Sequence, residues 1–152
     1  MTLTKLLAAD RLRKRKTSAD EILSLLEVVE RDIKDAKIEA LSDYRRYATA
    51  YNAALQLGRI MLLCAGYDTK GDGHHAAVFD AMPDILGKEY EKTALYFDSC
   101  RSKRNEVDYT GVFNVSSTEV NELIKEAEDF EIKIKNWITV NYPQFINEKS
   151  KN

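Results

Sequence analysis

Residues 116–138 of this chain have the sequence SSTEVNELIKEAEDFEIKIKNWI, and this stretch decides the fold class. Apolar residues recur in it every three or four positions, which is the spacing of one face of an α-helix. The apolar positions are Val120, Leu123, Ile124, Ala127, Phe130, Ile134, Trp137 and Ile138. Ser116 and Glu119 have the spacing of a capping box, which marks the start of a helix. The stretch therefore predicts a long amphipathic helix that begins at Ser116 and ends before Pro143.

Two more helices are predicted in the first half of the chain. The segment Ser18-Ala-Asp-Glu21 fits a second capping box, and the apolar residues behind it keep helical spacing as far as Ala36. Ser42 is a suitable N-cap for the next helix, which continues to residue 65 and stops at Gly66. The later half of that helix is apolar on almost all sides, which is typical of a central helix packed against several neighbours. Its interruptions are Gln56, Gly58 and Arg59.

The second half of the chain adds two helices and no sheet. Residues 74–82 predict a short helix that Pro83 stops, and residues 88–109 predict a longer one. The Gly-rich segment 67–73 has the composition of a surface loop. No segment alternates apolar and polar residues long enough to predict a sheet, and only residues 112–115 are β-like. We therefore predict an all-α fold, an up-and-down bundle of four to five helices with a short helix inserted before residue 88.

Composition and charge are those of an ordinary globular domain. Hydrophobic residues make up 44% of the 152 residues and charged residues 32%, so a single domain can bury a core. The formal net charge of −2 excludes attraction of the whole molecule to nucleic acid and leaves local basic patches open. We expect a basic lead at residues 1–16, the bundle at 17–142 and a frayed tail at 143–152. Because the sequence has no membrane span and no signal peptide, the expected location is the cytoplasm, with Cys64 and Cys100 as reduced thiols, one of them in the core.

The basic lead ends in Arg11-Leu-Arg-Lys-Arg-Lys16, which has five cations in six residues. Such a run is a candidate arm for a phosphate backbone or an acidic partner. The alternative, which we favour, is a solvated connector beside a helix start, because charge runs are common there. In that case the leucines of the lead dock on the bundle. They are Leu3, Leu6, Leu7 and Leu12.

The richest polar pattern lies near the end of the helix predicted at 88–109. Spacings of three and four residues place one set of side chains on a common face. The set is Arg101, Arg104, Asn105, Asp108 and Tyr109. Two guanidiniums, an amide, a carboxylate and a phenol suit a phosphodiester. The alternatives are a buried polar seam between subunits and a network within the bundle, for example an Arg104–Asp108 ion pair.

Metal binding is not predicted. The loop that begins at Asp68 resembles the start of a calcium-binding EF-hand, but Lys70 and Phe79 stand where ligands are needed. His74 and His75 are adjacent and diverge by about 100° on a helix, so they cannot both face one ion. We predict no metal site and no cofactor.

An aromatic stripe follows one face of the helix predicted at 42–65. Its members are Tyr44, Tyr47 and Tyr51, followed by Asn52. Such a stripe is more often core or interface than a platform for stacked bases. The neighbouring Arg45 and Arg46 keep a contact with nucleic acid open.

The segments on which a family resemblance rests are spread along the chain. They are the basic lead, Lys16-Thr-Ser-Ala-Asp-Glu21, Ala50-Tyr-Asn-Ala-Ala-Leu-Gln-Leu57, Ala65-Gly-Tyr67, Gly73-His-His-Ala76 and Lys103-Arg-Asn-Glu-Val-Asp-Tyr109. From Leu6 to Val140 the chain resembles HEPN-domain proteins, small helical bundles of prokaryotic toxin–antitoxin and phage-defence systems. In catalytic relatives the late helix has an Arg, usually a polar residue such as Asn after it, and a His four to six residues later. The resemblance implies metal-independent RNA cleavage by two such motifs that meet across a homodimer interface.

This chain departs from the motif at its last position. Arg104 and Asn105 match the start, but Tyr109 stands at the position of the His. The unperturbed pKa of Tyr is about 10 against about 6.5 for His, so Tyr is a poor proton shuttle near neutral pH. The resemblance therefore implies a non-catalytic or conditionally active protein that binds RNA or a partner. The alternative is a metal-independent endoribonuclease toxin that uses Arg104, Asn105 and Tyr109.

Both hypotheses assign roles to residues around the motif. In the ribonuclease, Arg104 binds the scissile phosphate, and further candidates for phosphate contact are Arg101, Lys103 and His74, the last also as substitute base. The binding hypothesis expects RNA, a second copy of the chain, or a minimal nucleotidyltransferase or other neighbour-encoded protein as partner. In such pairs the nucleotidyltransferase can modify a motif Tyr with AMP, so the resemblance makes Tyr109 a candidate target.

Overall fold

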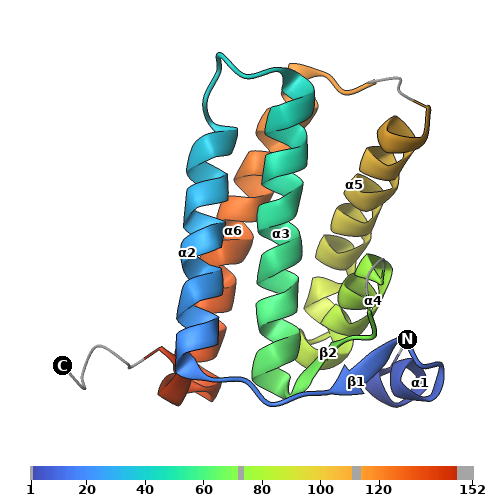
Figure 1. Cartoon of the computed structure of the whole chain (residues 1–152), viewed down its shortest axis with the longest axis vertical. Coiled ribbons are helices and arrows are strands. Elements are labelled where there is room, and N and C mark those ends of the chain that lie inside the picture. The colour runs from blue at the N-terminus through green and yellow to red at the C-terminus, as the bar shows by residue number, and fades with distance from the viewer. Residues whose placement is uncertain (1, 72–73, 111–113, 147–152) are drawn as a thin grey trace.

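The computed structural model describes residues 2–71, 74–110 and 114–146, with side chains at all of these positions except 107–110. Four long helices make up most of it. They are α2 (Ala19–Ala36), α3 (Asp43–Ala65), α5 (Glu91–Thr110) and α6 (Ser117–Asn141). These helices run alternately up and down, and α3 lies between α2 and α5 (Figure 1). The predicted all-α bundle is confirmed.

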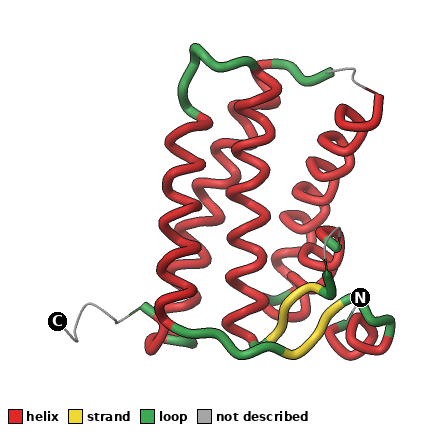
Figure 2. The backbone as a smooth tube through the Cα atoms, in the orientation of Figure 1, coloured by secondary structure: helices red, strands yellow, loops and turns green. Residues whose placement is uncertain are grey.

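Shorter elements connect and flank the long helices. They are α1 (Leu3–Ala8), β1 (Leu12–Lys14), β2 (Tyr67–Thr69), α4 (His75–Leu86) and the 3-10 helices η1 (Lys88–Tyr90) and η2 (Pro143–Phe145). The two strands pair antiparallel, with Leu12 opposite Thr69 and Arg13 opposite Asp68 (Figure 2). The prediction of no sheet, with a surface loop at 67–73, is therefore wrong for residues 67–69. Each strand has three residues, which is too short for alternation to appear in the sequence.

The one β-like tetrad of the sequence, residues 112–115, does not contribute to this small sheet in the part that is described. Asn114 and Val115 belong to neither helix nor strand. Residues 112 and 113 lie outside the described residues.

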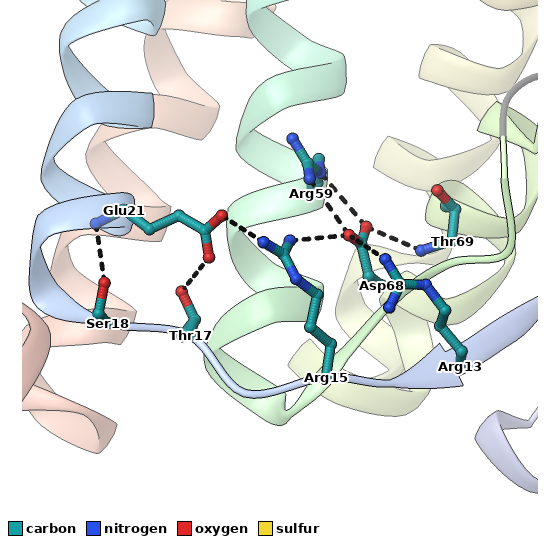
Figure 3. Close-up of polar contacts among 8 residues, drawn as sticks. All are labelled: Arg13, Arg15, Thr17, Ser18, Glu21, Arg59, Asp68 and Thr69. Atoms are coloured by element: carbon teal, nitrogen blue, oxygen red, sulfur yellow. Dashed lines mark hydrogen bonds and ion pairs between the residues drawn. The ribbon is translucent and has the colours of Figure 1, made fainter.

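Serine side chains start the three helices at which the sequence predicted N-caps. Each accepts a hydrogen bond at 3.2 Å from the backbone N–H three residues later. They are Ser18, Ser42 and Ser116. Ser116 forms a complete capping box with Glu119. The capping box predicted at Ser18 is only half formed. The Glu21 carboxylate accepts hydrogen bonds from the side chains of Thr17 and Arg15 in place of the backbone N–H of Ser18 (Figure 3).

Helix α4 passes through Pro83, although the sequence predicted that this proline stops it. A proline inside a helix removes one backbone N–H and crowds the carbonyl four residues earlier. Ala81 and Met82, immediately before it, are fully buried, so packing of this turn on the core offsets that cost. The helix ends instead at Gly87, which has a φ of 119° and donates its N–H to the carbonyl of Pro83 at 2.9 Å.

The core is centred on α3. Aromatic rings of α3, α4, α5 and α6 contact one another in a row, through Tyr51, Phe79, Phe97 and Phe130. Gly58 allows α3 to lie against α4, because a Cβ atom at this position would lie 2.4 Å from Cγ1 of Val78. The prediction that residues 55–65 form a central helix packed on several sides is confirmed.

Cys64 and Cys100 are both free and both buried, whereas the sequence placed only one of them in the core. Burial raises the pKa of the Cys64 thiol to about 12. Across the described residues, no helix has the length and apolar character needed to cross a membrane.

The basic lead is a folded part of the molecule. Leu6 and Leu12 are buried, and Leu3 and Leu7 pack partly against the core, which confirms the predicted docking of the leucines. The run 11–16 is not a solvated connector, because it includes β1 and its arginines form ion pairs. The pairs are Arg11 with Asp80, Arg13 with Asp68, and Arg15 with both Asp68 and Glu21. Arg13, Lys14 and Lys16 keep the exposed character expected of an arm.

The end of the chain also differs from expectation. Residues 143–146, predicted as the start of a frayed tail, form η2, and Phe145 and Ile146 pack against the core. The rest of the predicted tail, residues 147–152, lies outside the described residues.

Candidate functional site on helix α5

Arg104 lies on the α5 face that the sequence singled out, and it contacts Tyr51 of α3. Helix α3 is the neighbour of α5 in Figure 1. Its Cζ atom is 5.5 Å from the centroid of the Tyr51 ring, which is a cation–π contact. The Nε atom of Arg104 is buried and has no hydrogen-bond partner in the described part of the chain, and the same is true of the Tyr51 hydroxyl oxygen. The pair is thus a half-buried cation on a buried ring, with two unsatisfied polar atoms.

The Tyr51 hydroxyl is neutral near pH 7. Burial raises its pKa, and the nearby positive charges of Arg101 and Arg104 oppose that rise only in part. The hydroxyl can donate or accept a hydrogen bond, but it offers no negative charge to Arg104 and cannot act as a general base.

Arg101 is held by an acidic residue of its own helix. Its Nε donates to Oδ1 of Asp98 at 2.8 Å, and the side chain is 24% exposed. This hydrogen bond raises the pKa of Arg101. A phosphate at Arg101 would have to compete with Asp98. Arg104 has no carboxylate partner among the residues whose side chains are described, so its charge is the uncompensated one of the two.

Lys103 and Asn105 lie apart from the Arg104–Tyr51 contact. Lys103 forms an ion pair with Glu119 of α6, and this hydrogen bond lowers the pKa of Glu119. Lys103 therefore contacts α6, whereas Arg104 contacts α3. Asn105 is exposed to solvent.

The remaining predicted site residues are placed only in part. His74 precedes α4 and is half-buried, and no described contact joins it to Arg101 or Arg104. The side chains of Asp108 and Tyr109 lie outside the described residues, although the backbone of both belongs to α5. The Arg104–Asp108 ion pair and the role of Tyr109 stay predictions.

Two tyrosines of the aromatic stripe of α3 are part of the core. Tyr47 is 4% exposed and Tyr51 is 1% exposed, so neither ring is available to stack on a base. Asn52 donates to Oδ2 of Asp32 at 2.6 Å. Arg46, which the sequence left open for nucleic acid, is itself buried and donates from Nε to the carbonyl of Ala36 at 2.9 Å. The interpretation as core is thus confirmed for Tyr47 and Tyr51, whereas Tyr44 is only half-buried.

A second polar cluster was not predicted as a site. Asp68 of β2 is buried, and three guanidiniums lie against its carboxylate (Figure 3). They belong to Arg13, Arg15 and Arg59. The signal in the sequence was Arg59 itself, a charged residue in the largely apolar later half of α3, because such a charge needs a partner. Which residue supplies the partner depends on the pairing of β1 with β2.

A comparison with protein families finds a family to which the chain is similar. The model of the SAV_6107-like HEPN family matches residues 38–135, which is more than half of the chain. The chain belongs to the HEPN family. The match contains α3, α4 and α5, and with them Arg104 and the position of Tyr109. The resemblance seen in the sequence is thereby confirmed for residues 38–135, whereas α1, β1 and α2 lie outside the matched range. Comparisons with curated proteins and with solved structures find no match.

Proposed function

We propose that this HEPN protein is a non-catalytic or conditionally active RNA-binding component of a toxin–antitoxin or phage-defence module. In this proposal Arg104 contacts an RNA phosphate, and two copies of the chain bring their α5 faces together in a homodimer. The observation that supports it is the charge of Arg104, which is half-buried on the Tyr51 ring and has no carboxylate partner among the described side chains. A guanidinium positioned in this way loses little freedom when a phosphate arrives.

The balance between binding and cleavage rests on Tyr109. A general acid–base pair works best with a pKa near the operating pH, and a Tyr at the position of the family's His lacks such a pKa. His74 is the substitute base that the sequence suggested, and it makes no described contact with Arg104. Binding without cleavage is therefore the function we favour over the endoribonuclease that uses Arg104, Asn105 and Tyr109.

The test combines two assays on the same purified protein. Labelled total RNA and tRNA are incubated with it in EDTA to detect cleavage, and fluorescence anisotropy measures binding as a function of salt. Wild type is compared with Arg104→Ala, Tyr109→Phe and Arg31→Ala. The last variant is the matched control, because it removes one arginine from an exposed position on α2, which is not part of the candidate site. Light scattering on the same samples reports whether the chain is a dimer.

We expect wild type to bind RNA without cutting it. Arg104→Ala should weaken binding about tenfold, because a charge-assisted contact is lost, and should lower the slope of log K against log salt by about 0.7. Arg31→Ala should change neither value. Equal binding by wild type and Arg104→Ala would overturn the assignment of the site. Cleavage in EDTA that disappears in Arg104→Ala would establish the endoribonuclease instead. Folded wild type that neither binds nor cuts RNA would exclude both, and a neighbour-encoded protein would become the next partner to test.

A further inference from the structure

We propose a second site in this protein, a pocket beside the two strands that binds a small phosphorylated molecule. We call it the ribbon pocket. It is lined by Arg13, Leu55, Gln56, Arg59, Asp68, Thr69, Gly71, His75 and Val78, and its volume is about 340 Å³. That volume is within the range of small-molecule sites, near its lower end. None of the lining residues belongs to the α5 face around Arg104.

The charge around this pocket favours an anion. Three arginines face two carboxylates, because Arg13, Arg15 and Arg59 lie against Asp68, and Arg15 also binds Glu21 (Figure 3). Among the side chains that the structure describes around this cluster, one positive charge is therefore left over. We assign this charge to Arg13, because the Nη2 atom of Arg13 is 3.7 Å from Asp68 and the Arg13 side chain is 48% exposed. Arg15 and Arg59 make closer contacts with the carboxylate.

The acidic member of the cluster is already satisfied. Oδ1 and Oδ2 of Asp68 accept hydrogen bonds from Arg59, Arg15 and the backbone N–H of Thr69. Burial alone would raise the pKa of Asp68, but these hydrogen bonds outweigh it and lower the pKa below its ordinary value. Asp68 therefore stays ionised and holds the arginines in place without needing a cation from solution.

Hydrogen-bonding capacity remains in the wall of the pocket. The amide oxygen of Gln56 is buried and has no partner in the described part of the chain. Gln56 and Arg59 are three residues apart on α3, so they present an amide and a guanidinium on one side of that helix. Arg13 adds a second guanidinium from β1. Donors that converge from different elements suit a tetrahedral oxyanion better than a planar carboxylate.

The other side of the pocket is apolar. Leu55 and Val78 contribute to its lining and are themselves largely buried. A volume of about 340 Å³ is more than an inorganic ion needs, whereas the carbon skeleton of a phosphomonoester would fill it. A hydroxyl group on that skeleton could bond with the Gln56 side chain once its unpartnered amide oxygen turns from its buried position toward the pocket. The ligand class is thus a phosphomonoester of a small hydroxylated molecule.

The experiment uses the full chain and ribose 5-phosphate as the probe. Binding is followed by two-dimensional NMR at the backbone amides of Thr69 and His75, and by calorimetry. Ribose tests the need for the phosphate, inorganic phosphate tests the need for the skeleton, and citrate tests carboxylates. Arg13→Ala and Gln56→Leu are compared with Lys14→Ala, which removes an exposed cation from the next position of the same strand without touching the pocket. Arg104→Ala separates this site from the α5 face.

We expect saturable binding of ribose 5-phosphate and none of ribose. Arg13→Ala should weaken binding about tenfold, and Gln56→Leu several-fold at unchanged charge, while Lys14→Ala and Arg104→Ala bind as wild type does. Retention of the wild-type circular dichroism spectrum by Arg13→Ala would show that the loss is local, since this exposed ion pair contributes little to stability. The proposal is overturned if the amide resonances show no saturable shift up to about 10 mM ribose 5-phosphate. It is also overturned if Lys14→Ala weakens binding as much as Arg13→Ala does, or if citrate binds more tightly than ribose 5-phosphate.

Discussion

Arg59 holds both carboxylate oxygens of Asp68, with Nε 3.2 Å from Oδ1 and Nη2 3.2 Å from Oδ2. Arg15 adds a bond of 2.9 Å to Oδ2. The three residues belong to α3, to β2 and to the connection between β1 and α2. One buried carboxylate therefore ties the strands and the start of α2 to the central helix.

Substitution of Asp68 by Asn should destabilise the protein by about 3 kcal/mol, because it leaves guanidiniums without their buried partner. Urea unfolding followed by circular dichroism measures the change. Asp10→Asn is the matched control, since Asp10 pairs with Lys70 at an exposed position and Asn tolerates its φ of 59°. The control should lie within about 0.5 kcal/mol of wild type. A loss in Asp68→Asn no larger than in the control would contradict the role of this carboxylate.

Stability should fall on acidification through the same cluster. Hydrogen bonds lower the pKa of Asp68 and of Glu21 against the opposing effect of burial, from ordinary values of 3.8 and 4.5. Because the folded-state pKa values lie below the unfolded ones, their stabilisation is complete above about pH 5 and is lost as the pH falls through the folded values. The free energy of unfolding measured from pH 7 to pH 2.5 should follow this course. The profile of Asp68→Asn should be flatter below about pH 4, and an unchanged slope would argue against the linkage.

Tyr51→Phe should leave the free energy of unfolding unchanged or raise it by up to about 1 kcal/mol. The reason is that the buried Tyr51 hydroxyl has no partner in the described part of the chain, so its removal relieves a desolvation cost and keeps the ring under Arg104. Tyr47→Phe serves as comparison, because the Tyr47 hydroxyl hydrogen-bonds with Cys100, and it should cost about 1 kcal/mol. A clear loss of stability in Tyr51→Phe would mean that this hydroxyl has a partner after all.

Gly58→Ala should destabilise the protein by about 2 kcal/mol, although Ala is the better helix former. The added methyl would lie 2.4 Å from Cγ1 of Val78, so α3 and α4 would have to move apart. Thermal unfolding of the single variant and of Gly58→Ala in a Val78→Ala background tests the cause. The second substitution should cost less in the Gly58→Ala protein than in wild type, and strictly additive losses would rule out the contact as the reason.

Much of the fold was predictable because its signals are local. The three serine caps, the αL stop at Gly66 and the stripe of α6 depend on neighbours within one or two helical turns. The central position of α3 followed from its nearly uniform apolar character. Pro83 was misjudged because burial of the preceding turn, which lies outside any local rule, offsets the cost of a proline.

For the candidate site, too, the sequence predicted the local relationships, and the tertiary structure decided the contacts between distant segments. The sequence by itself determined that Arg101 and Arg104 share a helix face, and Asp98, three residues before Arg101, is close enough in sequence to bind it. Only the tertiary structure decided that Arg104 lies over Tyr51 of another helix and that Arg59 meets Asp68 of β2. Helical spacing specifies which side chains share a face of a helix. The groups that those side chains contact depend on how distant segments of the chain pack. That packing determines which cation is neutralised by a carboxylate and which keeps its charge for a ligand.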